Sequence, residues 1–164
     1  MVSPTGRIRE VARSAIVEVP PSPRGAKKLR TNPDRSRLMA NVRSFGNKST
    51  ELRVMQIFRT HQIKGWRRHY PLIGRPDFAF RNERLLLFVD GCFWHGCPRC
   101  YSAPRSNSKF WREKYQYNSA RDRRVTATLR QQGWRVLRLW EHDLKDGSRV
   151  ARRVLLLLKP RAKK

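Results

Sequence analysis

Apolar residues in the middle of the chain follow patterns that predict a sheet. Leu85–Val89 is apolar at every position, as expected for a central strand that is buried on both faces. Turn residues precede it, with Arg81-Asn82-Glu83 one residue before the run and Gly74-Arg75-Pro76 further upstream. We expect three further strands, at 66–70, 77–80 and 134–140.

Helical spacing of apolar residues predicts four helices around these strands. The longest spans 110–132 and is ended by Gly133, a residue typical of helix C-terminal caps. Another begins after Ser49 or Thr50 as its N-cap and continues to about residue 61. Two short helices are expected at 37–45 and in the first part of 148–164. This order of elements indicates an α/β domain, with a mixed β-sheet flanked by helices on both faces.

The two ends of the chain differ from its middle. Residues 1–35 hold five of the ten prolines and show no periodicity, which predicts a basic, disordered tail. Residues 148–164 contain seven basic residues and no acid, which indicates a short docking helix followed by a basic terminus. One folded domain is therefore expected over 36–147.

Net charge narrows the class of partner. The chain has 38 Lys and Arg against 12 Asp and Glu, a formal charge of +26, and such an excess favours a polyanion such as nucleic acid. Charge alone leaves open a ribosomal or nucleoid protein that only neutralises phosphate. The first thirty residues lack the apolar run of a signal peptide, and the longest apolar stretch, 154–158, is too short for a membrane span. We therefore expect a soluble, cytoplasmic protein without a membrane partner.

All three cysteines lie close together and predict a metal site. Cys92, Cys97 and Cys100 are separated by four and then two residues, and the C-x2-C pair lets two thiolates reach one tetrahedral ion. A fourth ligand is needed, and either His95 within the cluster or His142 after the last strand can supply it. Three buried free thiols are the alternative, but the clustering favours one structural zinc.

Two aspartates stand at the ends of expected strands. Asp77 follows Pro76 and opens one strand, whereas Asp90 ends the next, so we expect both at the same edge of the sheet. Cleavage of a phosphodiester needs a divalent cation, and carboxylates are the ligands that magnesium prefers. The pair therefore predicts a magnesium-dependent hydrolytic site, with a turn-capping role for Asp77 as the simpler alternative.

Polar residues also occur on the inward face of the long helix. Asn118 and Asp122 share that face with Val125 and Leu129 at spacings of three and four. Burying polar groups is costly unless they are used, which favours a functional role, although Asp122 has flanking arginines with which to pair. Glu51 has a simple interpretation as a favourable acid in the first turn of a helix.

Five segments together resemble the very short patch repair endonucleases, over about 36–144: Gly74–Asp77, Asp90–His95, Phe110–Trp111, Arg121–Arg124 and Gly133–Leu137. The resemblance implies a restriction-endonuclease-like fold. It also implies an enzyme that nicks one DNA strand next to the thymine of a T·G mismatch and so initiates very short patch mismatch repair. The partner would be double-stranded DNA with a mismatch, bound by a monomer near the bacterial nucleoid, with accessory mismatch-repair proteins as further candidates.

The same resemblance implies roles for individual residues. Asp77 and the backbone carbonyl of Val89 would hold catalytic magnesium, and His95 would activate the attacking water. Three further polar residues would reach the metal through bound water or support that shell: Glu51, Asp122 and Asn118. The zinc ligands would be Cys92, Cys97, Cys100 and His142.

Three aromatic residues resemble the wedge that enters the base stack beside the mismatch: Phe93, Trp94 and Trp111. Opening a stack costs a few kcal/mol per step and least at a mispair, so inserted aromatics select sites that are already weakened. Core packing is the alternative for these side chains, although Phe93 and Trp94 stand in an expected loop.

The sequence departs from the best-known members of this family at three places. Val89 replaces a threonine, and Asp90 replaces a second catalytic histidine, so that Asp90 either binds metal or orients His95. Cys97 and Cys100 replace a closer-spaced His and Cys pair, and His142 stands where the family has Cys. Two rival functions remain, a restriction-like or structure-specific DNA nuclease and a non-catalytic zinc-containing DNA-binding module.

Overall fold

A computed structural model describes residues 49–159 of the chain. The expected tail at 1–35 and the expected helix at 37–45 lie outside the described residues, as does the basic end at 160–164. Three α-helices, four strands and one 3-10 helix follow one another within the described part: α3 (Glu51–Thr60), β1 (Trp66–Arg68), β2 (Phe78–Phe80), β3 (Leu85–Asp90), α4 (Ser108–Gln131), β4 (Arg135–Trp140), η1 (Glu141–Lys145) and α5 (Gly147–Leu158). The order of helices and strands predicted for this part of the chain is confirmed.

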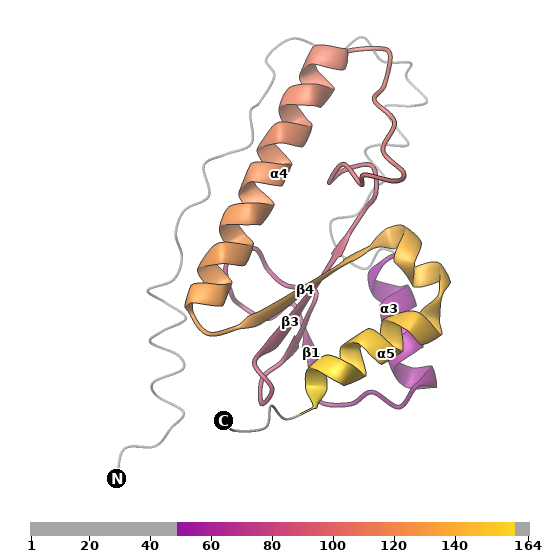
Figure 1. Cartoon of the computed structure of the whole chain (residues 1–164), viewed down its shortest axis with the longest axis vertical. Helices are drawn as coiled ribbons and strands as arrows, with labels where there is room; N and C mark the ends of the chain where they lie inside the picture. The colour runs from indigo at the N-terminus through magenta and orange to yellow at the C-terminus, as the bar shows by residue number, and fades with distance from the viewer. Residues whose placement is uncertain (1–48, 160–164) are drawn as a thin grey trace.

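The four strands form one mixed sheet in the order β1-β2-β3-β4. β1 and β2 pair antiparallel, as do β2 and β3, whereas β3 and β4 run parallel. β3 is central and almost entirely buried, as its uninterrupted apolar run predicted. The arrangement is an α/β, restriction-endonuclease-like fold, with α4 on one face of the sheet and α3 and α5 on the other (Figure 1).

The first strand ends two residues earlier than the expected 66–70. His69 has a φ of 48°, in the left-handed region, which ends the extended conformation after Arg68. The long helix fits its prediction more closely. It ends at Gln131, and Gly133 follows with a φ of 79°, as a C-terminal cap requires.

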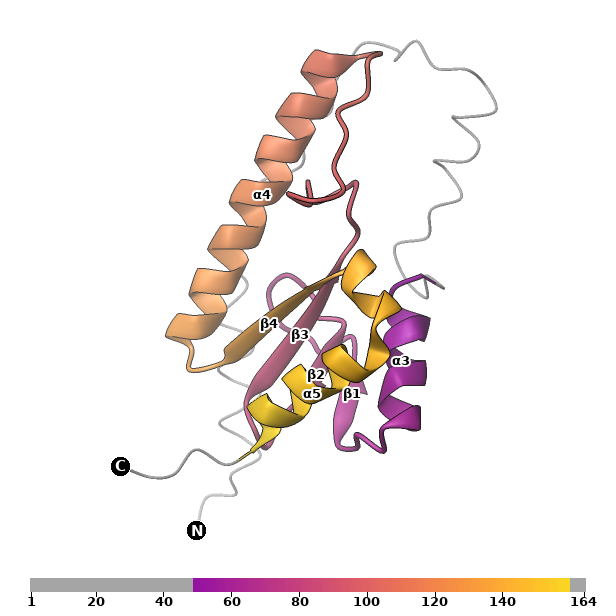
Figure 2. The ribbon, with the colours of Figure 1, turned by 45° about the vertical axis from the view of Figure 1, so that its right-hand side comes forward.

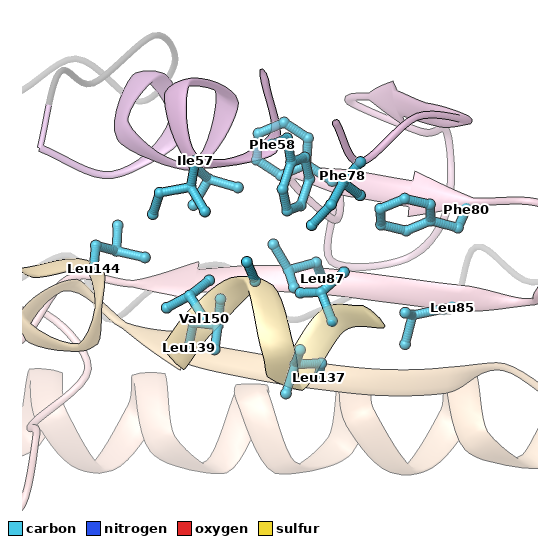
Figure 3. Close-up of a cluster of buried hydrophobic side chains, with 14 residues drawn as sticks. Ile57, Phe58, Phe78, Phe80, Leu85, Leu87, Leu137, Leu139, Leu144 and Val150 are labelled. Carbon is cyan, nitrogen blue, oxygen red and sulfur yellow. The ribbon is translucent and has the colours of Figure 1, made fainter. Parts of the chain in front are cut away.

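The larger apolar core lies between the sheet and the pair α3 and α5. Phe58 of α3 makes edge contacts with Phe78 and Phe80 of β2, at ring-centroid distances of 5.3 and 5.7 Å. Leu85 and Leu87 of β3 are fully buried on the same side, where the side chains of the strands and both helices meet (Figure 3). This core confirms that the C-terminal helix docks on the domain, because Val150 and Val154 of α5 belong to it.

The smaller core lies on the opposite face of the sheet, under the C-terminal half of α4. Val125 and Leu129 of α4 pack there against Leu86 and Phe88 of β3. The other half of α4 extends past the sheet and runs beside the segment 91–107 (Figure 1 and Figure 2). Within residues 49–159 no helix is long and apolar enough to cross a bilayer.

Candidate functional site

The three cysteines and His142 converge on one point beyond the end of β3. The three Sγ atoms, of Cys92, Cys97 and Cys100, lie 3.3, 3.4 and 3.4 Å from Nδ1 of His142. Thiolate and imidazole ligands around a tetrahedral zinc stand about 3.5 Å apart, given typical metal–ligand lengths. The four donor atoms therefore fit one zinc ion.

Neighbouring residues orient this cluster. Oδ1 of Asp143 lies 3.4 Å from Nε2 of His142, the ring nitrogen that faces away from the sulfur atoms. A carboxylate at that position fixes the ring of a metal-binding histidine. The backbone N–H of Cys92 donates to Glu141 at 3.4 Å, which links the start of the loop to η1.

The thiols of Cys92 and Cys97 have pKa values shifted in opposite directions. Burial raises the pKa of Cys92 to about 11, with further increases from the neighbouring thiols. Burial also acts to raise the pKa of Cys97, but the N–H groups of Arg99 and Cys100 donate to its sulfur and lower the pKa overall. Several thiolates in one place repel each other, so a bound cation would favour the ionised form of all three.

His95 is grouped with two acidic residues rather than with the cysteines, and it pairs with Asp122 of α4. Its Nδ1 lies 2.5 Å from Oδ2 of Asp122, whereas Oδ1 of Asp90 is 3.6 Å away. The bond to His95 and the positive charges of Arg138 and Arg121 lower the pKa of Asp122 although burial acts to raise it. The carboxylate of Asp122 therefore stays ionised, and it engages Nδ1 of His95, so that Nε2 is the ring nitrogen left for another partner.

Asp77 lies directly before β2 and faces β3. Its Oδ2 accepts a hydrogen bond of 2.7 Å from the backbone N–H of Val89. Burial, with the nearby carboxylates of Glu51 and Asp90, raises the pKa of Asp77 from 3.8 to about 6, against the opposing effects of that hydrogen bond and of Arg138. Such a carboxylate favours a cation partner, because ionisation is otherwise costly here.

One cavity of about 440 Å³ brings these polar groups together. Its lining includes seven charged or titratable side chains, those of Arg75, Asp77, Asp90, His95, Arg121, Asp122 and Arg138. The prediction that Asp77 and Asp90 lie at the same edge of the sheet is thereby confirmed. A second cavity of about 470 Å³ adjoins it and shares four of these residues, namely Asp90, His95, Asp122 and Arg138.

Asp90 is held by an arginine that the sequence did not single out. Nε and Nη2 of Arg138 donate to the two carboxylate oxygens of Asp90 at 2.7 and 2.5 Å. Burial alone lowers the pKa of Arg138, but the bond to Asp90 and the charge of Asp122 raise it, so the pair is ionic. The only signal in the sequence was an arginine in a strand whose inward face packs on a helix.

Glu51 is buried at the start of α3 and is more than a favourable acid in a first turn. It forms an ion pair with Arg68 of β1, and its Oε2 lies 3.4 Å from Nε2 of His69. The negative charge of Glu51 contributes to the raised pKa of Asp77.

Asn118 and the aromatic residues shape the loop beside the cavity. The buried amide of Asn118 donates to the backbone carbonyl of Trp94 at 2.8 Å, so it holds the loop against α4. The ring of Phe93 packs edge-on against Trp94 and Trp111, with centroids 5.3 and 5.0 Å apart. These three rings form one cluster, and each remains partly exposed.

Gly96 allows this loop to lie close to α4. It has a φ of 66°, and a Cβ atom at this position would lie 1.8 Å from a ring carbon of Tyr115. Only glycine meets both requirements without movement of the helix or the loop.

Comparison with known proteins gives one consistent family. The model of the family "DNA mismatch endonuclease Vsr" matches residues 28–101. The type II nicking enzyme V.XorIIP of Xanthomonas oryzae pv. oryzae is 38% identical over 134 residues, which cover 80% of this chain and 97% of that protein. The DNA mismatch endonuclease Vsr of Escherichia coli K12 is 33% identical, over 71% of this chain and 77% of that protein. The type II nicking enzyme V.NmeDIP of Neisseria meningitidis serogroup C is also 33% identical, over 70% of this chain and 78% of its own length.

Proposed function

The chain belongs to the DNA mismatch endonuclease Vsr family, and we propose that it nicks one strand of DNA next to the thymine of a T·G mismatch, with magnesium. The observation that carries this proposal is the cavity in which Asp77 and the His95–Asp122 pair meet. Such an arrangement combines a carboxylate that favours a cation with an imidazole whose second nitrogen is free to accept a proton.

Magnesium would be held by Asp77 and by the backbone carbonyl of Val89. The donor set fits the ion, because both ligands are oxygens and a carboxylate with a raised pKa gains most from a cation. One carboxylate oxygen of Asp77 is already fixed by the N–H of Val89, which holds the side chain in place. When bound, the ion would neutralise charge that develops on the phosphate.

His95 would serve as the general base. Its Nδ1 is committed to Asp122, so Nε2 is the nitrogen that takes a proton from the water attacking phosphorus. Glu51 would act on the metal through water, and Asp122 has the same proposed role besides orienting His95. Asn118 would act indirectly, through its bond to the backbone of the loop that carries His95.

Zinc is proposed for the site formed by Cys92, Cys97, Cys100 and His142. The ion would be structural, because all four protein donors are used and none is replaced by water. It would fix the loop that contains both His95 and the aromatic cluster of Phe93, Trp94 and Trp111. These rings are proposed to enter the base stack beside the mismatch, where unstacking costs least.

The decisive experiment is a nicking assay on end-labelled duplexes. We expect magnesium-dependent nicking of a T·G duplex, with much weaker cleavage of the matched duplex and of other mispairs. Equal cleavage of all duplexes would mean that the protein is a nuclease without mismatch specificity. If neither magnesium nor manganese supports nicking, the result would favour the alternative of a non-catalytic, zinc-containing DNA-binding module.

Two variants test the residue assignments in the same assay. Asp77→Ala and His95→Ala are each expected to abolish nicking while the dissociation constant for the T·G duplex changes little. Arg135→Met is the control, because Arg135 lies at the other end of β4 and donates to the carbonyl of Glu83. If either catalytic variant nicks at the wild-type rate, its proposed role is wrong.

Cellular context follows from the substrate. The relatives come from bacteria, so we propose that the enzyme acts on DNA in the bacterial cytoplasm. A monomer is proposed, because Asp77, His95 and Asp122 all lie in one chain around one cavity. Accessory mismatch-repair proteins remain candidate partners.

A further inference from the structure

A largely buried arginine stands where the acidic and histidine side chains of the site converge. Arg138 binds both oxygens of Asp90, at 2.7 and 2.5 Å. The Nη2 atom that takes part in this pair also lies 3.4 Å from Oδ1 of Asp122. Asp122 in turn holds Nδ1 of His95 at 2.5 Å. One guanidinium therefore touches both carboxylates that compete for the imidazole.

The parallel pairing of β3 and β4 creates this contact. Arg138 is paired in register with Phe88, two positions before Asp90. The guanidinium lies over the ring of Phe88, 4.9 Å from its centroid, on the face of the sheet that α4 covers. Its third nitrogen, Nη1, is 3.5 Å from Oγ1 of Thr126 on α4. Two elements, β3 and α4, thus hold the arginine in one orientation.

The positive charge of Arg138 bears on whether the neighbouring acidic residues and His95 bind a metal ion. Asp90, His95 and Asp122 offer donor atoms close enough together to hold a metal ion. The guanidinium lies against both of these carboxylates and is always protonated, so it already provides the cation that they attract. Asp90 uses both of its oxygens on the arginine and stands 3.6 Å from His95, against 2.5 Å for Asp122.

We propose that Arg138 is a positioning residue, which removes Asp90 from competition for His95 so that Nδ1 of the imidazole binds Asp122 alone. Nε2 then keeps one fixed direction for the water that attacks phosphorus. This inference rests on the proposed function of His95. It gives Asp90 a role that is neither that of a metal ligand nor that of a direct partner of the histidine.

The kinetic test compares Arg138→Met with Arg135→Met, two substitutions on the same strand. Loss of a residue that orients a catalytic group typically lowers activity by about 10–100-fold. We expect kcat on the T·G duplex to fall by about this factor in Arg138→Met, with KM changed less than about threefold, because no contact with DNA is lost. Arg135→Met should keep the wild-type kcat. Equal kcat values for the two variants would overturn the proposal.

A double variant separates positioning from simple loss of charge. D90N/R138M lacks the unpaired carboxylate that would attract His95, so its kcat should exceed that of Arg138→Met. If the double variant is as impaired as Arg138→Met, competition by Asp90 is not the cause. If thermal melts show that Arg138→Met is not folded, R138K is used instead. Lysine keeps the positive charge but lacks the two N–H donors that bind both oxygens of Asp90. R138K is expected to lose activity relative to R135K, and equal activity of the two lysine variants would overturn the proposal.

A readout without catalysis distinguishes this inference from the proposed function. Long-range ¹⁵N NMR of the histidine rings reports which nitrogen of His95 carries the proton, with His95→Ala used for assignment. We expect an Nδ1–H tautomer in the neutral ring of the wild type and altered ring signals in Arg138→Met. Unchanged ring signals would overturn the positioning role. A wild-type protein that nicks no duplex would refute the proposed function, while the NMR comparison would still test Arg138.

Discussion

Replacing Asp77 with Asn is expected to abolish nicking and, at the same time, to stabilise the fold. Burial and the carboxylates of Glu51 and Asp90 raise the pKa of Asp77 to about 6. Ionisation of Asp77 therefore destabilises the folded protein when no cation is bound. Asn offers an amide oxygen to the N–H of Val89, so the substitution removes the charge and keeps an acceptor for this hydrogen bond. A residue that costs stability in this way indicates a functional demand on the position.

The magnitude follows from the two pKa values of Asp77. The pKa is 3.8 for an ordinary aspartate and about 6 in the fold, so the folded state binds more protons between these values. Stability therefore falls as pH rises through this window, and the loss is complete above pH 6. A shift of about two units corresponds to roughly 3 kcal/mol. At pH 8 the free energy of unfolding of Asp77→Asn should exceed that of the wild type by up to this amount.

Urea unfolding measures the difference, with zinc retained and no magnesium added. Between pH 5 and pH 8 the advantage of Asp77→Asn should grow by roughly 1.4 kcal/mol, since the wild type loses its remaining proton in this interval. Asp77→Ala is the control, because it removes the charge and also the acceptor for the N–H of Val89. It should be less stable than Asp77→Asn at every pH. A destabilised Asp77→Asn at pH 8, or a difference that does not change with pH, would refute the reasoning.

Three further outcomes are expected. Metal analysis should find one zinc per chain, lost in His142→Ala and kept in His95→Ala; the reverse result would make His95 a ligand. Gly96→Ala should lower the free energy of unfolding by roughly 1–3 kcal/mol, because the added Cβ meets the ring of Tyr115, and melts that match the wild type would contradict this contact. Trp94→Ala should reduce the preference for the T·G duplex over the matched one in binding, and an unchanged ratio of dissociation constants would argue against the wedge.

Local signals in the sequence were sufficient for the order of the elements and for the three cysteines of the candidate metal site. The uninterrupted apolar run at Leu85–Val89 predicted a central strand because a strand with helices over both faces has no polar side. The cysteines predicted a metal site because their spacing brings the sulfur atoms together within one loop. Spacing alone left His95 and His142 open, and only the family resemblance favoured His142, since His142 reaches the cluster through the pairing of β4 with β3.

Local sequence patterns could not predict the partner of Asp90 either, because this contact also depends on how β3 and β4 pair. Arg138 is 48 positions away along the chain and meets Asp90 through the register of two parallel strands. The end of the first strand at Arg68 was also not predicted. The left-handed conformation of His69 is unusual for a residue with a side chain, and the apolar pattern does not report it.

The aspartate at position 90 changes the charge that the site has to accommodate. The carboxylate of Asp90 adds a negative charge near Asp77, where it raises the pKa of the proposed magnesium ligand. Arg138 acts in the opposite direction on that pKa and also binds Asp90 directly. A lone aspartate would therefore both hinder ionisation of Asp77 and compete with Asp122 for His95. The arginine offsets both effects, so Asp90 and Arg138 act as one ion pair within the site.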